Sequence, residues 1–215
     1  MKNTPHPLFS LETSPEAPAQ PANGFALDKN RFLSLRDKLA NAKKGRPPKF
    51  MIRASNADDI VRQIPARGER LHATLRGDCT LCDVVSGIIQ KFGPGAICHM
   101  ATLSMNEKNA AQLAQLLASG QIASLNLLWS SYFSETSKSD VAPACRSLLS
   151  AATIGIARCH AKTYVLNCGI DSFVVETSAN LRSSGNVEQA TFFNDADLAQ
   201  FHAAWISELI QKSNL

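Results

Sequence analysis

Residues 160–180 read HAKTYVLNCGIDSFVVETSAN, the most informative segment of the sequence for predicting its fold. Two runs that contain apolar, β-branched and aromatic residues, HAKTYVLNC and SFVVETSA, are separated by Gly169, Ile170 and Asp171. Such runs favour strands, and a glycine-containing connection this short favours a tight turn. The stretch therefore predicts a β-hairpin.

Polar residues stand at the ends of this hairpin. We expect His160 to open the first strand, with Lys162 projecting from the same face two residues later. The return strand brings Ser178 and Asn180 to the same rim, and the following loop supplies Glu188. An imidazole can attack phosphorus, a lysine and an amide can neutralise the phosphate oxygens, and a carboxylate can hold the imidazole. Each residue alone also has an ordinary structural reading, as a strand end or a solvated charge.

Outward from the hairpin, strand and helix patterns alternate from Gly68 onward. Strands are expected over 70–77, 96–103, 122–133, 152–157, 160–168 and 172–179, and helices over 79–93, 106–120, 137–149 and 195–212. This alternation predicts an α/β fold, a mixed β-sheet with helices packed on both faces.

Two helix starts are predicted from capping residues. Ser104 and Glu107 have the spacing of a capping box before the helix over 106–120. Asp195 is the expected cap of the last helix, which carries Phe201, Trp205 and Leu209 on one face.

The order HAK, then TSANL, then GNVE resembles the signature of the phospholipase D superfamily: His-x-Lys, Gly-Ser-x-Asn and a downstream Glu. The resemblance covers roughly Gly68 to Leu215 and implies a phospholipase D-like fold. It implies that His160 is the nucleophile, that Lys162, Ser178 and Asn180 bind phosphate, and that Glu188 orients the imidazole.

The sequence departs from this signature at two positions. Asn167 stands where the family usually has Asp, and Thr177 stands where it usually has Gly. The interval from Lys162 to Ser178 is also a few residues longer than the common pattern.

The chain has one His-x-Lys element, whereas the superfamily reaction uses two histidines. The resemblance to single-motif endonucleases therefore implies a homodimer that builds one shared site about a twofold axis. Of the other histidines, His72 and His99 are expected to be core or strand-edge residues, His202 to lie on a helix face, and His6 to lie in the tail.

The net charge of +4 is unevenly distributed over the 215 residues. Residues 28–67 contain 11 Lys and Arg against four Asp, whereas residues 1–27 and 68–215 are slightly acidic. We expect a disordered, proline-rich tail over 1–27, a basic helical arm or linker over 28–67, and the phospholipase D-like domain over 68–215.

GRPPK, residues 45–49, looks like the core of an AT-hook, which binds the minor groove of A·T-rich DNA. Nucleic-acid-binding residues are expected to be Lys43, Lys44, Arg46 and Lys49, and a solvated basic linker is the alternative.

Composition and motifs exclude several classes of protein. With 45% hydrophobic and 19% charged residues the chain is typical of a soluble globular protein, and no apolar run is long enough to span a bilayer. We expect a cytoplasmic location with neither a membrane span nor a secretory leader. The six cysteines are interpreted as reduced thiols, and Cys79 and Cys82 as packing residues because no second CxxC accompanies them. No glycine-rich phosphate loop, HExxH or GxSxG is present.

These observations predict a metal-independent phosphodiesterase without a cofactor, a nuclease acting on nucleic acid, with DNA expected over RNA, through a phosphohistidine intermediate in a homodimeric site. One alternative is a catalytically weak or inactive DNA-binding module of the same fold. Another is a phospholipid phosphodiesterase, although no amphipathic membrane-binding helix is seen in the sequence.

Overall fold

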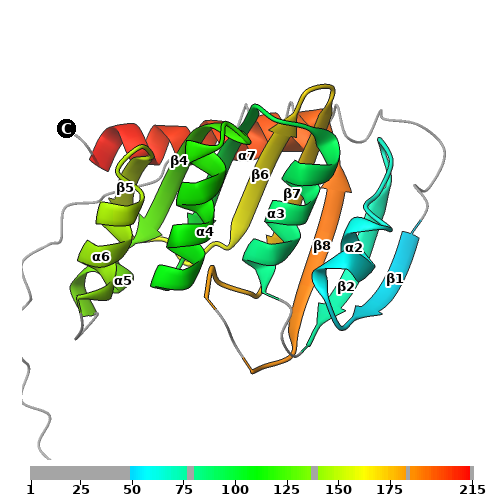
Figure 1. Cartoon of the computed structure of the whole chain (residues 1–215), viewed down its shortest axis with the longest axis horizontal. Helices are drawn as coiled ribbons and strands as arrows, with labels where there is room; N and C mark the ends of the chain where they lie inside the picture. The colour runs from blue at the N-terminus through cyan, green and yellow to red at the C-terminus, as the bar shows by residue number, and fades with distance from the viewer. Residues whose placement is uncertain (1–48, 77–79, 137–139, 183–184, 214–215) are drawn as a thin grey trace, which may run out of the picture. The chain divides into compact units, whose positions relative to one another are not determined.

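A single mixed sheet organises the part of the chain that the computed structural model describes, namely residues 49–76, 80–136, 140–182 and 185–213. Its strands lie in the order β1-β2-β8-β7-β6-β3-β4-β5 (Figure 1). Pairing is parallel between β1 and β2, β3 and β4, and β4 and β5, and antiparallel elsewhere. The strands are β1 (Lys49–Ala54), β2 (Arg70–Leu75), β3 (Ala96–Thr102), β4 (Ile122–Ser130), β5 (Thr153–Ala157), β6 (Thr163–Cys168), β7 (Asp171–Thr177) and β8 (Glu188–Asn194).

Helices cover both faces of this sheet. One face carries α3 (Leu81–Phe92) and α4 (Glu107–Ala118), with α2 (Ala57–Val61), α5 (Ser131–Thr136) and α6 (Val141–Leu148) beside them, and α7 (Ala196–Ser213) lies behind the sheet (Figure 1). The alternation of side chains along β6 explains the two layers. Tyr164 and Leu166 belong to the large core under α3 and α4, whereas Val165 belongs to a core with Ala199 of α7. The predicted fold class is confirmed.

The predicted hairpin joins β6 to β7. Gly169 occupies the turn with a φ of 62°, a left-handed conformation that glycine adopts without steric cost. The register places Cys168 opposite Asp171 and Asn167 opposite Ser172.

The sheet begins within residues 28–67, where the sequence indicated a helical arm or linker. β1 pairs with β2 along its whole length, and α2 follows it and buries Ile60. Residues 1–48, including the predicted tail and most of the basic arm, lie outside the described residues.

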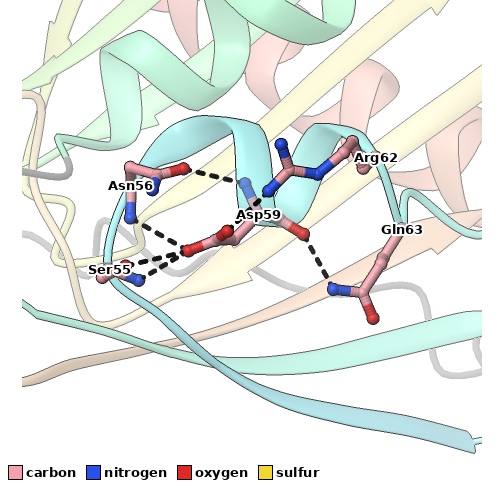
Figure 2. Close-up of polar contacts among 5 residues, drawn as sticks. All are labelled: Ser55, Asn56, Asp59, Arg62 and Gln63. Carbon is pink, nitrogen blue, oxygen red and sulfur yellow. Dashed lines mark hydrogen bonds and ion pairs between the residues drawn. The ribbon is translucent and has the colours of Figure 1, made fainter.

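A capping box starts α2, as Figure 2 shows. Asn56 accepts a hydrogen bond from the Asp59 amide at 3.0 Å, and the Asp59 carboxylate accepts from both the amide and the hydroxyl of Ser55 at 3.0 Å. These hydrogen bonds from Ser55 hold the pKa of Asp59 below its usual value. Arg62 pairs with the other Asp59 oxygen at 2.8 Å. The contacts join the end of β1 to the start of α2.

The cap of α4 differs from the prediction. Asn106, not Ser104, accepts the capping hydrogen bond, from the Asn109 amide at 2.9 Å. The reason is a tertiary contact: Met105 forms a β-bridge with Leu181, and the Asn106 amide donates to the Leu181 carbonyl at 3.1 Å. This pairing keeps the chain extended as far as Asn106, so the helix begins later.

The cap of α7 is confirmed, but its buried face is not the predicted one. Asp195 accepts a hydrogen bond from the Leu198 amide at 3.0 Å. The buried residues of α7 are Ala199, His202, Ile206 and Ile210, whereas Phe201, Trp205 and Leu209 are only partly buried. The buried residues recur every three or four positions and form one stripe along the helix, and the three predicted residues each precede a member of that stripe, so they lie at its side.

Two further expectations concern thiols and membranes. Cys82 is fully buried and free, as a packing thiol requires, and Cys79 lies outside the described residues. Burial raises the pKa of the Cys82 thiol to about 12. In the part of the chain that the structure describes, no helix is both long enough and apolar enough to cross a bilayer.

Candidate functional site

His160 and Lys162 lie in the segment between β5 and β6. The Lys162 ammonium donates to the His160 carbonyl oxygen at 3.0 Å, and its Nζ is 3.3 Å from Nδ1 of the same imidazole. The expectation that both residues belong to the strand is wrong, because β6 starts only at Thr163. In the segment before β6, the Lys162 side chain instead turns back to the His160 carbonyl. The histidine and the lysine nevertheless meet as predicted.

Partial burial changes the electrostatics of Lys162. Desolvation lowers the pKa of its ammonium, while the nearby Cys159 and Glu188 act in the opposite direction. The exposed imidazole of His160 therefore lies against a cation that is partly shielded from water.

Ser178 and Glu188 form a second pair, between the end of β7 and the start of β8. The Ser178 hydroxyl donates to Glu188 Oε2 and accepts from the Gln189 amide at 3.0 Å. The Ser178 amide donates to the Gln189 carbonyl at 3.0 Å. The structure thus pairs Glu188 with Ser178 and His160 with Lys162, whereas the family resemblance implied that Glu188 would hold the imidazole.

Thr177 fastens the turn that carries Ser178 and Asn180. Its hydroxyl donates to the Gln189 carbonyl at 2.6 Å and accepts from the Ala179 amide at 3.0 Å, contacts that a glycine could not make. Tyr164 donates to the Ala179 carbonyl at 3.2 Å from within the core. Asn180 follows, and its Oδ1 is buried without a hydrogen-bond partner among the described residues.

A cavity of about 980 Å³ lies beside these residues. His160, Lys162 and Ser178 line it, and Asn180 and Glu188 are outside its described lining. Three of the five predicted site residues therefore line one cavity. Of the other two, Asn180 follows Ser178 by two residues, and Glu188 accepts a hydrogen bond from Ser178.

A further acidic group faces this cavity that the sequence did not indicate. Glu176 lines it and accepts a hydrogen bond from His202 Nε2 at 3.0 Å, while Trp205 Nε1 donates to His202 Nδ1 at 3.0 Å. Since Nδ1 accepts, the neutral ring carries its proton on Nε2. This hydrogen bond lowers the pKa of Glu176. No local pattern links Glu176 to a helix that begins 20 residues later, so only the packing of α7 reveals the contact.

The remaining predicted binding residues lie at the N-terminal side. Lys43, Lys44 and Arg46 are outside the described residues, and Lys49 begins β1. Among the described residues, no three His, Cys, Asp or Glu side chains gather closely enough to hold a metal ion.

Comparison with known proteins gives matches only among solved structures. No protein-family model matches the sequence, and no curated protein matches it. The crystal structure of Nuc from Salmonella typhimurium, a phospholipase D family member, gives a TM-score of 0.47 at 11% identity and covers 66% of this chain and 94% of that one. NucT from Helicobacter pylori gives 0.46 at 12% identity, covering 66% of this chain and 97% of that one.

A third match is the polyphosphate kinase from Porphyromonas gingivalis, with a TM-score of 0.47 at 12% identity. It covers 76% of this chain but 26% of that one, so the resemblance there is to one part of a larger protein. All three matches have TM-scores below 0.5 and identities of 11% or 12%, and the first structure is that of a phospholipase D family member.

Proposed function

We propose that the protein is a metal-independent phosphodiesterase that cleaves DNA through a phosphohistidine at His160. The observation that carries the proposal is the contact of Lys162 with the imidazole and carbonyl of His160, both of which line the same cavity as Ser178. A nucleophile beside a fixed cation is the pair that phosphoryl transfer needs, because negative charge develops on the phosphate oxygens during attack.

The reaction has two steps in this proposal. A ring nitrogen of His160 attacks phosphorus, the P–O bond to the leaving oxygen breaks, and that oxygen takes a proton from an acid. Water then attacks the phosphohistidine and gives a proton to the group that acted as the acid in the first step, the P–N bond breaks, and the imidazole is regenerated. Lys162 neutralises charge on the phosphate oxygens and the Asn180 amide donates a hydrogen bond to them, while the hydrogen bond between Ser178 and Glu188 holds the turn that carries Asn180.

The acid is assigned to His160 of a second subunit. One chain carries a single His-x-Lys element, and a twofold axis brings identical residues to one site. This assignment makes the active species a homodimer.

The test of the proposal is cleavage of plasmid and single-stranded DNA in excess EDTA. We expect the rate to be unchanged, because a lysine and an amide rather than a metal ion neutralise the phosphate. A magnesium-dependent nuclease, stopped by the same chelator, is the control. Loss of cleavage in EDTA with recovery on adding magnesium would replace the histidine mechanism with a metal-assisted one.

One observation favours a second candidate function, a DNA-binding module of weak or no activity. Because the Lys162 ammonium approaches Nδ1, the neutral imidazole carries its proton on Nε2 in this arrangement, and neither nitrogen has a free lone pair. Attack requires Lys162 to turn from the ring to the phosphate. A protein in which it does not turn would bind DNA without cleaving it, and binding measured in the absence of cleavage distinguishes this candidate.

The basic residues before β1 are expected to strengthen DNA binding. Changing Lys43, Lys44 and Arg46 to glutamine should weaken binding and flatten the plot of log affinity against log salt by up to about 0.9 for each phosphate that is no longer neutralised. Fluorescence anisotropy over a range of salt concentrations measures this slope. A slope equal to that of the unchanged protein would identify the segment as a solvated linker.

A further inference from the structure

The cavity at His160 extends far beyond the residues proposed to react. Its lining continues from the segment before β6 across β7, β8 and β2 to the edge strand β1, where it includes Met51 and Arg53. A single phosphate would occupy only one end of a space of about 980 Å³. The rest of the cavity needs a separate explanation.

One row of side chains crosses the sheet from the candidate site to its edge. Arg53 pairs with Thr74 in the register of β1 and β2, and Thr74 pairs with Gln189 in the register of β2 and β8. Gln189 in turn exchanges hydrogen bonds with Ser178. Residues directly opposite one another point to the same face of a sheet, and all four of these line the cavity. The row carries one arginine, three neutral hydrogen-bonding side chains and no carboxylate.

This face of β1 and β2 is uncovered by the described elements. Arg53 and Thr74 are exposed, and Met51 is 81% exposed, whereas Leu71 and Ala73 on the opposite face are buried. The α7 helix packs instead on β3 to β7. No hydrogen bond or ion pair engages the Arg53 guanidinium within the described residues, so this cation is available to a ligand.

Arg53 lies too far from the reacting phosphate to bind it. Three strand spacings of about 4.8 Å, from β7 to β1, place its strand roughly 14 Å from that of Ser178. An arginine at that distance cannot bind the phosphate held by Lys162. A ligand that contacts both must carry a second anionic group, as a polymer with repeated phosphates does.

The surroundings of Arg53 favour a single strand over a duplex. Met51 lies beside His72 in the register of β1 and β2, and both line the cavity, so an apolar chain and an imidazole ring form a ledge. The His72 ring is held by Thr191, whose Oγ1 is 2.9 Å from Nδ1. Unpaired bases stack on such surfaces and on open sheet faces, whereas a duplex hides the faces of its bases.

We propose that Arg53 is a distal phosphate-binding residue, and that the row from Arg53 through Thr74 and Gln189 binds the backbone of a single-stranded nucleic acid whose reacting diester lies at His160. The inference rests on the proposed function for the position of the reacting diester. It adds a second anchoring point, so the protein discriminates a polymer from a small diester.

The experiment compares two substrates and three variants of the full chain. The substrates are bis(p-nitrophenyl) phosphate and a labelled single-stranded oligodeoxythymidylate, with anisotropy measuring binding of the latter in a His160→Ala background, where the proposed nucleophile is absent and the oligonucleotide stays intact. Arg53→Gln should raise the Kd and KM for the oligonucleotide about tenfold or more, the loss expected for one charged hydrogen-bonding group, and leave kcat/KM for the small diester unchanged. Arg53→Lys should recover part of the binding. Arg62→Gln is the matched control, because Arg62 is an exposed arginine that pairs with Asp59 on α2 (Figure 2).

The outcomes separate this inference from the proposed function. If the unchanged protein cleaves neither substrate but Arg53→Gln still weakens oligonucleotide binding, the inference stands and the catalytic proposal fails. If both substrates are cleaved and Arg53→Gln behaves like Arg62→Gln, the distal site is wrong. If Arg53→Gln weakens binding of a duplex competitor as much as it weakens binding of the oligonucleotide, the preference for a single strand is wrong.

Discussion

Replacing His160 with alanine is expected to lower the rate of diester cleavage by about four orders of magnitude or more, because the nucleophile of the proposed reaction is lost. His160 is exposed, so the variant should fold as the unchanged protein does. Circular dichroism and thermal unfolding verify the fold, and plasmid nicking in EDTA measures the rate. Cleavage by the folded variant at the unchanged rate would remove His160 from the mechanism.

The same variant tests whether two subunits share one site. When equal amounts of His160→Ala and unchanged chains are unfolded and refolded together, random pairing leaves about a quarter of the dimers without the substitution. If each reaction needs two His160 side chains, activity per total protein should fall to about a quarter of that of unchanged protein treated identically. Activity near one half would mean that each chain holds a complete site, and a monomer in solution would have the same implication.

Replacing Gly155 with alanine is expected to destabilise the protein by about 2 kcal/mol, which is typical of overpacking. A Cβ at this position in β5 would lie 2.6 Å from the Ile210 Cα and 2.6 Å from the Ser213 Oγ. Backbone cannot yield as a flexible side chain does, so α7 would have to move. That movement would strain the hydrogen bond from the Ile156 amide to the Ser213 hydroxyl, now 3.1 Å. Urea unfolding of both proteins measures the difference.

Gly185 provides the matched control for this prediction. A Cβ built there meets no atom of the described residues within 4 Å, so Gly185→Ala should change the free energy of unfolding by less than about 0.5 kcal/mol. Equal stabilities of the two variants would mean that α7 is not held tightly against β5.

The sequence was sufficient for features that depend on near neighbours. The hairpin between β6 and β7 was predictable because a short connection that contains Gly169 joins two apolar runs, and glycine readily adopts the left-handed conformation that the turn requires. The cap of α7 was predictable because Asp195 accepts a hydrogen bond from the Leu198 amide, only three residues later in the chain. Hydrophobic periodicity, which reports which side of each element is buried, predicted most strands and helices from β2 onward and with them the mixed α/β class. It missed β8, whose start the sequence assigned to a loop, and it extended the strand over 122–133 into residues that form α5.

The candidate site was predictable in part for the same reason. His160 and Lys162 are two residues apart, so their contact needed no knowledge of the rest of the chain. Glu188 was different: its hydrogen bond to Ser178 depends on the pairing of β8 with β7, and the sequence indicated another partner for it.

The tertiary structure alone decided which distant segments lie together. β1 could be assigned to the sheet only by its pairing with β2, and Ser104 was displaced as a helix cap by the bridge between Met105 and Leu181. The contact of Glu176 with His202 likewise depends on α7 crossing the sheet. Local propensities act over a few residues, whereas hydrogen bonds between strands and packing between layers act across any separation in sequence. Periodicity therefore determined the type of most elements between β2 and α7, and long-range pairing added β1 and β8 to the sheet and determined the neighbours of each strand and the cavity at His160.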